Sequence, residues 1–86
     1  MPEVSRFYGM VISFNWRDHP PRHFHVRYAE WHATIRLDRL ELASGTLPQR
    51  ALALVLEWAA IHREELEENW RRARTQEPLQ PIEPLD

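Results

Sequence analysis

The sequence predicts an α+β fold, in which a three- to four-stranded antiparallel sheet is followed by one long C-terminal helix and a proline-rich tail. Apolar residues alternate with polar ones in the first half of the chain, which is typical of half-buried strands. In the second half they recur at the spacing of one helix face. Near the end, prolines recur at the period of polyproline II. We therefore expect a single domain over residues 1–76 and a tail over residues 77–86 that packs on the domain or on a partner.

The first predicted strand runs from Phe7 to Trp16. Its largest side chains share one face of the strand: Tyr8, Met10, Ile12, Phe14 and Trp16. The pair Pro20-Pro21 follows soon afterwards, and two prolines cannot extend a central strand because they lack backbone N–H groups. We therefore expect a loop after Trp16.

A hairpin is predicted next. Its two strands are expected over residues 23–28 and 31–37. If Ala29-Glu30 forms a two-residue turn, Tyr28 faces Trp31 across the hairpin. Both central residues of a type I′ turn need positive φ, so a longer loop is the alternative. A short fourth strand is expected around residues 41–42.

One long helix is predicted from about Pro48 to Arg74. Thr46 is expected to cap its N-terminus, with Gln49 reaching back to Thr46. One apolar stripe of the helix is expected to pack on the sheet: Leu52, Val55, Leu56, Ala59, Leu66, Trp70 and Ala73. A second apolar patch is predicted as an interface with the tail or with a partner: Leu54, Trp58 and Ile61.

The composition excludes several classes of protein. The 86 residues include no cysteine, and all 11 basic residues are arginine. Disulfide scaffolds, thiolate zinc sites, cysteine nucleophiles and lysine Schiff bases are therefore excluded. The formal net charge is −2, so nucleic acid would have to bind at a local patch. The chain has no apolar run typical of a signal peptide or a membrane span, so we expect a cytoplasmic protein with no membrane partner.

Histidine and arginine gather on one face of the predicted hairpin. The candidate catalytic residues are His23, His25, His32, Arg27 and Arg36. Histidine titrates near neutral pH, and arginine binds phosphate through its planar fork. One histidine would take the proton of an RNA 2′-hydroxyl, another would protonate the leaving oxygen, and an arginine would stabilise the charged phosphate. This hypothesis is a metal-independent ribonuclease that needs no cofactor.

The same stretch also has the composition of a metal site. His23 and His25 are two residues apart on a predicted strand, so both rings point to the same side. Asp18 or His19, in the preceding loop, would supply a third ligand. A divalent transition metal such as zinc, nickel or iron accepts this kind of ligand set. The alternative hypothesis is therefore a small metal-binding protein.

In a third interpretation, these side chains have neither a catalytic nor a metal-binding role. They would form the solvated face of a half-buried sheet, and the protein would be a non-catalytic interaction module. A chain this short buries only about 60% of the surface that its unfolded form exposes. Together with the second apolar patch, this favours a homo-oligomer or a complex with a small partner protein.

Several blocks of the chain resemble one known family. They are residues 2–9, the block Asp18-His19-x-Pro-x-His23-Phe24-His25, the helix residues 47–70 and the closing residues 78–85. Over essentially the whole chain, these blocks are similar to the domain-of-unknown-function 4160 family. Ala29 is a departure, because the resemblance leads us to expect a glycine at the hairpin turn.

The resemblance implies a small bacterial protein whose gene often neighbours that of another small family, domain of unknown function 2442. Such pairs are suspected toxin–antitoxin modules. We therefore expect a toxin–antitoxin component with a small antitoxin-type partner or a second copy of this chain, and with RNA as the substrate under the ribonuclease hypothesis. The family assigns no catalytic residue, so the candidate residues are argued from their chemistry alone.

Overall fold

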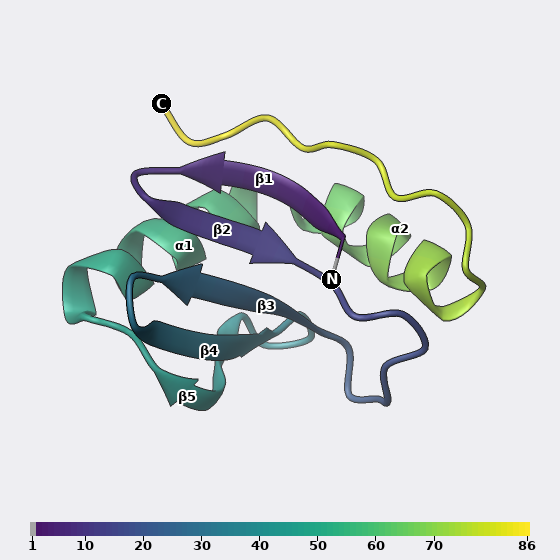
Figure 1. Ribbon diagram of the computed structural model, residues 1–86, viewed down its shortest axis with the longest axis horizontal. Helices are drawn as coiled ribbons and strands as arrows, with labels where there is room; N and C mark the ends of the chain where they lie inside the picture. The colour runs from purple at the N-terminus through teal and green to yellow at the C-terminus, as the bar shows by residue number, and fades with distance from the viewer. Residues whose placement is uncertain (1) are drawn as a thin grey trace.

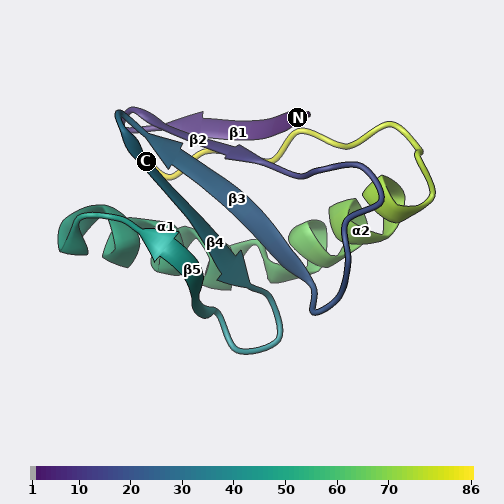
Figure 2. The same ribbon diagram turned by 60° about the horizontal axis from the view of Figure 1, so that its bottom comes forward.

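Within residues 2–86, which the computed structural model describes, five strands form one antiparallel sheet and two helices cover one of its faces (Figure 1, Figure 2). The strands follow one another across the sheet in chain order. They are β1 (Glu3–Phe7), β2 (Met10–Ser13), β3 (His23–Tyr28), β4 (Trp31–Arg36) and β5 (Glu41–Thr46). The helices are α1 (Gln49–Ile61) and α2 (Arg63–Arg74). The predicted α+β class is confirmed, whereas the numbers of strands and helices differ from the prediction.

The predicted single strand from Phe7 to Trp16 is wrong. β1 ends at Phe7 and β2 begins at Met10, so the two strands form a hairpin around Tyr8-Gly9. Tyr8 and Gly9 both have positive φ, at 50° and 80°, as a type I′ turn requires. The turn moves the buried residues from odd to even positions, because Phe7 pairs with Met10 and both are buried. Tyr8 hides this change in the sequence, since it extends the alternation of Met10 and Ile12 by one more large side chain. The sequence pattern of this hairpin therefore looks like that of one long strand.

The β3–β4 hairpin has the predicted register. Tyr28 pairs with Trp31 across a two-residue turn at Ala29-Glu30, so the longer loop is not adopted. Ala29 has a φ of 52°, a left-handed conformation that costs an alanine on the order of 1 kcal/mol. The pairing therefore holds although its turn lacks the glycine that this position favours.

β5 is longer than the predicted strand at residues 41–42. It continues to Thr46, which pairs with His32 of β4. The predicted helix cap at Thr46 is therefore wrong, because that residue belongs to the sheet. Pro48 occupies the N-cap position of α1, and within the described residues no side chain donates or accepts a capping hydrogen bond there.

The predicted single helix is divided into α1 and α2 at His62, whose φ of −110° and ψ of 27° depart from regular helix values. Beside this break, the Arg63 guanidinium donates hydrogen bonds of 2.7 Å to the carbonyls of Leu37 and Asp38. These bonds fix the start of α2 against the loop after β4. In the part of the chain that the structure describes, no helix is long and apolar enough to cross a membrane.

Trp58, one of the three predicted interface residues, lies in the core. Its ring is fully buried, 5.1 Å from the ring of Phe7, and its Nε1–H donates to the carbonyl of Glu83 at 2.8 Å. The tail therefore covers Trp58 and keeps it away from a partner. Leu54 is half-buried and Ile61 is 64% exposed, and their role at an interface stays a prediction.

The tail packs on the domain, where it runs along β1 at the edge of the sheet (Figure 1). The N–H of Ile82 donates to the carbonyl of Val4 at 2.8 Å, and the Ile82 side chain is buried. Asn69 of α2 holds the backbone of Gln80 with two hydrogen bonds. Covering β1 in this way protects an edge strand that would otherwise offer unpaired backbone groups to other chains.

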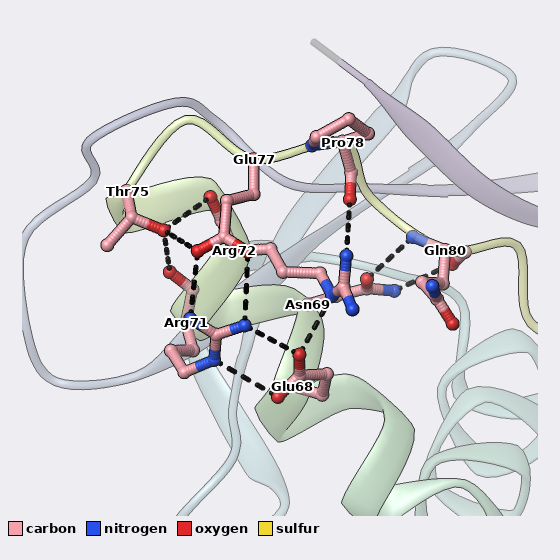
Figure 3. Close-up of polar contacts among 8 residues, drawn as sticks. All are labelled: Glu68, Asn69, Arg71, Arg72, Thr75, Glu77, Pro78 and Gln80. Carbon is pink, nitrogen blue, oxygen red and sulfur yellow. Dashed lines mark hydrogen bonds and ion pairs between the residues drawn. The ribbon is translucent and has the colours of Figure 1, made fainter.

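Charged side chains hold the beginning of the tail against the end of α2 (Figure 3). Arg71 lies between Glu68 and Glu77 and forms ion pairs of 2.8 and 2.9 Å with them. Arg72 forms a further ion pair with Glu68 and donates to the carbonyl of Pro78. Hydrogen bonds from Arg71, and secondarily from Arg72, lower the pKa of Glu68 to about 2.

Candidate metal centre

The loop between β2 and β3 is held against the end of α2. The N–H of Arg17 donates to the carbonyl of Ala73 at 3.1 Å, and its guanidinium donates to Oε1 of Gln76 at 2.7 Å. The end of the same loop is fixed by the N–H of Leu37, which donates to the carbonyl of Arg22. These contacts hold the loop on both sides of Asp18.

Asp18 brings its carboxylate to two histidines of β3. Its Oδ2 atom lies 2.8 Å from Nε2 of His23 and 3.1 Å from Nε2 of His25. The two histidines are two residues apart on the strand and so share a face. The three ligand atoms all lie within 4.8 Å of one another. Asp18, His23 and His25 are hereafter called the Asp18 triad.

Neighbouring groups fix the orientation of each member of the Asp18 triad. Nδ1 of His23 lies 2.7 Å from the carbonyl of Pro21 and donates a hydrogen bond to it. Nδ2 of Asn15 lies 3.2 Å from Nε2 of His25. The backbone N–H of His19 donates to Oδ1 of Asp18 at 3.0 Å. The remaining carboxylate oxygen of Asp18 is therefore the one that faces both imidazoles.

Burial and charge set the protonation of this cluster. Burial of the side chain acts to raise the pKa of Asp18, but hydrogen bonds from His25 and from the His19 amide, together with the charge of His23, outweigh it, so this pKa is lowered. Burial lowers the pKa of His25, and although the Asp18 carboxylate opposes this effect, the net shift is downward. The cluster therefore favours a charged carboxylate and a neutral imidazole at His25, which are the forms that bind a metal ion.

The structure separates the five candidate catalytic residues. Three of them line one hollow of about 210 Å³ in the sheet face that the helices leave open. We call it the open-face hollow, and its lining residues are Glu3, Arg6, Val11, Ser13, His25, Arg27 and His32. Of the other two, His23 belongs to the Asp18 triad, and Arg36 forms two hydrogen bonds with Asp38.

The ring nitrogens of His25 do not face open solvent. Nε2 is directed at Asp18, whereas Nδ1 is buried and has no hydrogen-bond partner within residues 2–86. The ring stacks on that of His32 with the centroids 5.5 Å apart. His32 itself is exposed. A proton transfer between His25 and a ligand in the open-face hollow would therefore require the His25 ring to turn.

The candidate metal ligands follow only in part from the sequence. His19 was an alternative to Asp18, but its ring is exposed and it contributes a backbone N–H to the cluster instead. Asn15 was not selected, although it lies close before Asp18. Arg6 and Glu3 were missed because β1 was not predicted. A two-residue turn at Tyr8-Gly9 would have placed Arg6 opposite Val11, as the structure does.

Comparison of the chain with curated proteins and with solved structures found no match in either set. The family model described as "Domain of unknown function (DUF4160)" matches residues 9–71. This match covers more than half of the chain, including the Asp18 triad, all of α1 and most of α2. The chain therefore belongs to the DUF4160 family.

Proposed function

We propose that the protein binds one divalent transition-metal ion through the Asp18 triad. The observation that supports this most directly is the convergence of Oδ2 of Asp18 with Nε2 of His23 and Nε2 of His25. Two histidines and one carboxylate form a ligand set used by zinc and by non-haem iron(II). The ligand set thus identifies a class of metal rather than a single element.

The hydrogen bonds of His23 favour a cation in this position. Because Nδ1 of His23 donates to the carbonyl of Pro21, a neutral ring has only a lone pair at Nε2. That lone pair would face a carboxylate oxygen of Asp18 at 2.8 Å, which is an unfavourable contact between two acceptors. A second proton on His23 or a bound metal ion would remove this conflict. Donation of the second ring N–H to a backbone carbonyl is also the usual way in which a metal-bound histidine is oriented.

The distances from Asp18 to the two histidines allow an ion to enter with little movement of these ligands. Metal–ligand bonds of about 2.0–2.2 Å place neighbouring ligands of a tetrahedral ion about 3.3 Å apart. The Asp18 oxygen now lies 2.8 and 3.1 Å from the two histidine nitrogens. On these two edges, an outward shift of a few tenths of an ångström would make room for the ion, and the two histidine nitrogens lie within 4.8 Å of each other. Three protein ligands leave a coordination position for water, as in catalytic zinc sites.

The metal-independent ribonuclease stays a hypothesis that competes with this proposal. It needs two histidines that exchange protons with a ligand, yet the ring nitrogens of His25 are directed at Asp18 or buried. The observed contacts therefore support metal binding better than acid–base catalysis by His25 and His32. The role in a toxin–antitoxin module also stays a prediction, and expression of the gene alone and beside its neighbour would test it through cell growth.

Metal content tests the proposal directly. Protein stripped with a chelator and then dialysed against zinc is expected to retain about one zinc per chain by elemental analysis, and the Asp18→Asn and His23→Ala variants are expected to retain almost none. His62→Ala is the matched control, because His62 lies outside the triad and is bonded to Glu65. Circular dichroism would show that each variant is folded.

Two results would contradict the proposal. One is wild-type protein that retains no zinc, nickel, cobalt or iron(II). The other is equal retention of metal by the His23→Ala and His62→Ala variants, since this would place the bound ion outside the triad.

A further inference from the structure

We infer that the open-face hollow binds the phosphodiester group of a nucleic-acid strand. This inference goes beyond metal binding, because it depends on the lining of the hollow and is argued for the protein without an ion at the Asp18 triad. It also adds Arg6 and Glu3, which come from β1, to the residues considered for function.

The hollow contains an arginine whose charge is not neutralised by a neighbour. Arg27 is exposed, and within residues 2–86 its guanidinium forms no ion pair and no side-chain hydrogen bond. Most other arginines of the protein form ion pairs or side-chain hydrogen bonds, for example Arg36 with Asp38 and Arg71 with Glu68. An unpaired guanidinium in a concave site is well suited to bind a phosphate, since its N–H groups match two phosphate oxygens.

Arg6 can contribute a second set of donors. Its Nε and Nη2 groups bind the two carboxylate oxygens of Glu3 at 3.0 and 2.8 Å. Nη1 is left without a partner within the described residues. The Glu3 carboxylate therefore orients the guanidinium of Arg6 while leaving one of its edges for a ligand.

The net charge of the hollow fits a diester better than a monoester. Arg6 and Arg27 carry two positive charges and Glu3 carries one negative charge, which leaves one net positive charge while the imidazoles are neutral. A phosphodiester carries one negative charge, whereas a phosphate monoester carries about −1.5 to −2 near pH 7. Glu3 would repel the additional charge of a monoester. The phosphodiester of a nucleic-acid strand is therefore the ligand that this lining matches.

The hollow has room for one such group. Its volume is about 210 Å³, compared with about 30 Å³ for one water molecule in the liquid. A single phosphate contact gives weak binding, in keeping with a protein of net charge −2. A ligand with one phosphodiester is consequently the appropriate probe.

A titration followed by NMR tests the inference. The dinucleotide UpU, which has one phosphodiester, is added to the ¹⁵N-labelled protein, and shifts of backbone and arginine Nε–H signals are recorded. We expect the largest shifts at Arg6, Arg27 and His32. Arg27→Gln is expected to weaken binding by about tenfold, because it removes a charge-assisted hydrogen bond. Glu3→Gln is expected to strengthen binding several-fold, because it removes the only carboxylate that lines the hollow in the described structure.

Matched variants provide the controls. Arg50→Gln and Glu57→Gln make the same changes of charge on exposed positions of α1, and both are expected to leave the affinity for UpU unchanged. Equal effects of Arg27→Gln and Arg50→Gln would overturn the inference. So would the absence of binding, or an affinity for inorganic phosphate or uridine 5′-monophosphate that equals or exceeds the affinity for UpU.

Measurements of zinc retention and of UpU binding on the same samples distinguish a failure of this inference from a failure of the proposed metal site. His23→Ala is expected to abolish zinc retention without removing the response of UpU affinity to Arg27→Gln. Zinc retention without UpU binding would reject the hollow alone, whereas UpU binding without zinc retention would reject the metal site alone.

Discussion

Asn69 and Gln80 are joined by two hydrogen bonds of 2.8 Å that run in opposite directions. The side-chain Nδ2–H of Asn69 donates to the carbonyl of Gln80, and Oδ1 of Asn69 accepts the N–H of Gln80. Asn69 is almost completely buried, at 1% exposure. Its amide therefore replaces the backbone partner that an adjacent strand would provide, and it fastens the proline-rich tail to α2 (Figure 3).

Removing this side chain is expected to loosen the tail. Asn69→Ala should lower the free energy of unfolding by about 2 kcal/mol, because it removes two hydrogen bonds that each contribute about 1 kcal/mol. Urea denaturation measures the loss, and faster hydrogen exchange at Ile82 would locate it in the tail. Gln80→Ala is the control, since only the backbone of Gln80 takes part in the two bonds. A similar loss of stability in both variants would contradict this role of Asn69.

The tail is also expected to respond to acid. The pKa of Glu68 is lowered to about 2 by its hydrogen bonds with Arg71 and Arg72, and Arg71 also lowers the pKa of Glu77. A carboxylate with a lowered folded-state pKa stabilises the folded state above its unfolded pKa, and the stabilisation is lost as the pH falls through the folded value. The ion pairs with Glu68 should therefore weaken between about pH 4.5 and about pH 2.

Comparing two glutamine variants isolates this effect. Glu68→Gln should flatten the acid dependence of the melting temperature, and high salt should reduce the difference from wild type because the ion pairs are exposed. Glu57→Gln, on an exposed position of α1, should leave the dependence unchanged, because Glu57 forms no ion pair within the described residues. An identical acid profile for wild type and Glu68→Gln would contradict the prediction.

A substitution in the turn of the β3–β4 hairpin is expected to stabilise the protein. Ala29 has a φ of 52°, which glycine adopts without the steric cost that alanine incurs. Ala29→Gly is expected to raise the free energy of unfolding by about 0.5–1 kcal/mol, measured by urea denaturation. The same change at Ala60, an exposed position within α1, is expected to lower stability by about 1 kcal/mol. A loss of stability in both variants would show that the left-handed turn is not strained in solution.

The sequence predicts those features of the fold that come from a periodic pattern of residues. The pairing of Tyr28 with Trp31 followed from alternation alone, because the side-chain period of a strand is two. The turn at Tyr8-Gly9 did not follow, because Tyr8 extends the alternation of the next strand into the turn itself. Likewise, the helical period marks an apolar face, but it does not show that Arg63 binds carbonyls of another segment and that the helix breaks beside it.

The residue types of the candidate site could be predicted from the sequence, whereas their full arrangement in space could not. His23 and His25 were placed on one face by their spacing, which is local information. The choice of Asp18 over His19 depends on the path of the loop, which is set by contacts such as that between Arg17 and Ala73. Such contacts join residues that are far apart in the chain and leave no periodic trace. For Arg36, the sequence predicted the face of the strand, but it did not predict the ion pair with Asp38.

Zinc is expected to stabilise the folded protein if it binds the Asp18 triad. A ligand that binds only the folded state adds about 2.7 kcal/mol to the free energy of unfolding at a concentration one hundred times its dissociation constant. The melting temperature of wild-type protein should therefore rise with zinc concentration. Asp18→Asn should abolish this rise, because an amide is a much poorer ligand than a carboxylate, while His62→Ala should retain it. A rise of the same size in Asp18→Asn would mean that zinc acts elsewhere on the chain, and the role of Asp18 as a ligand would be refuted.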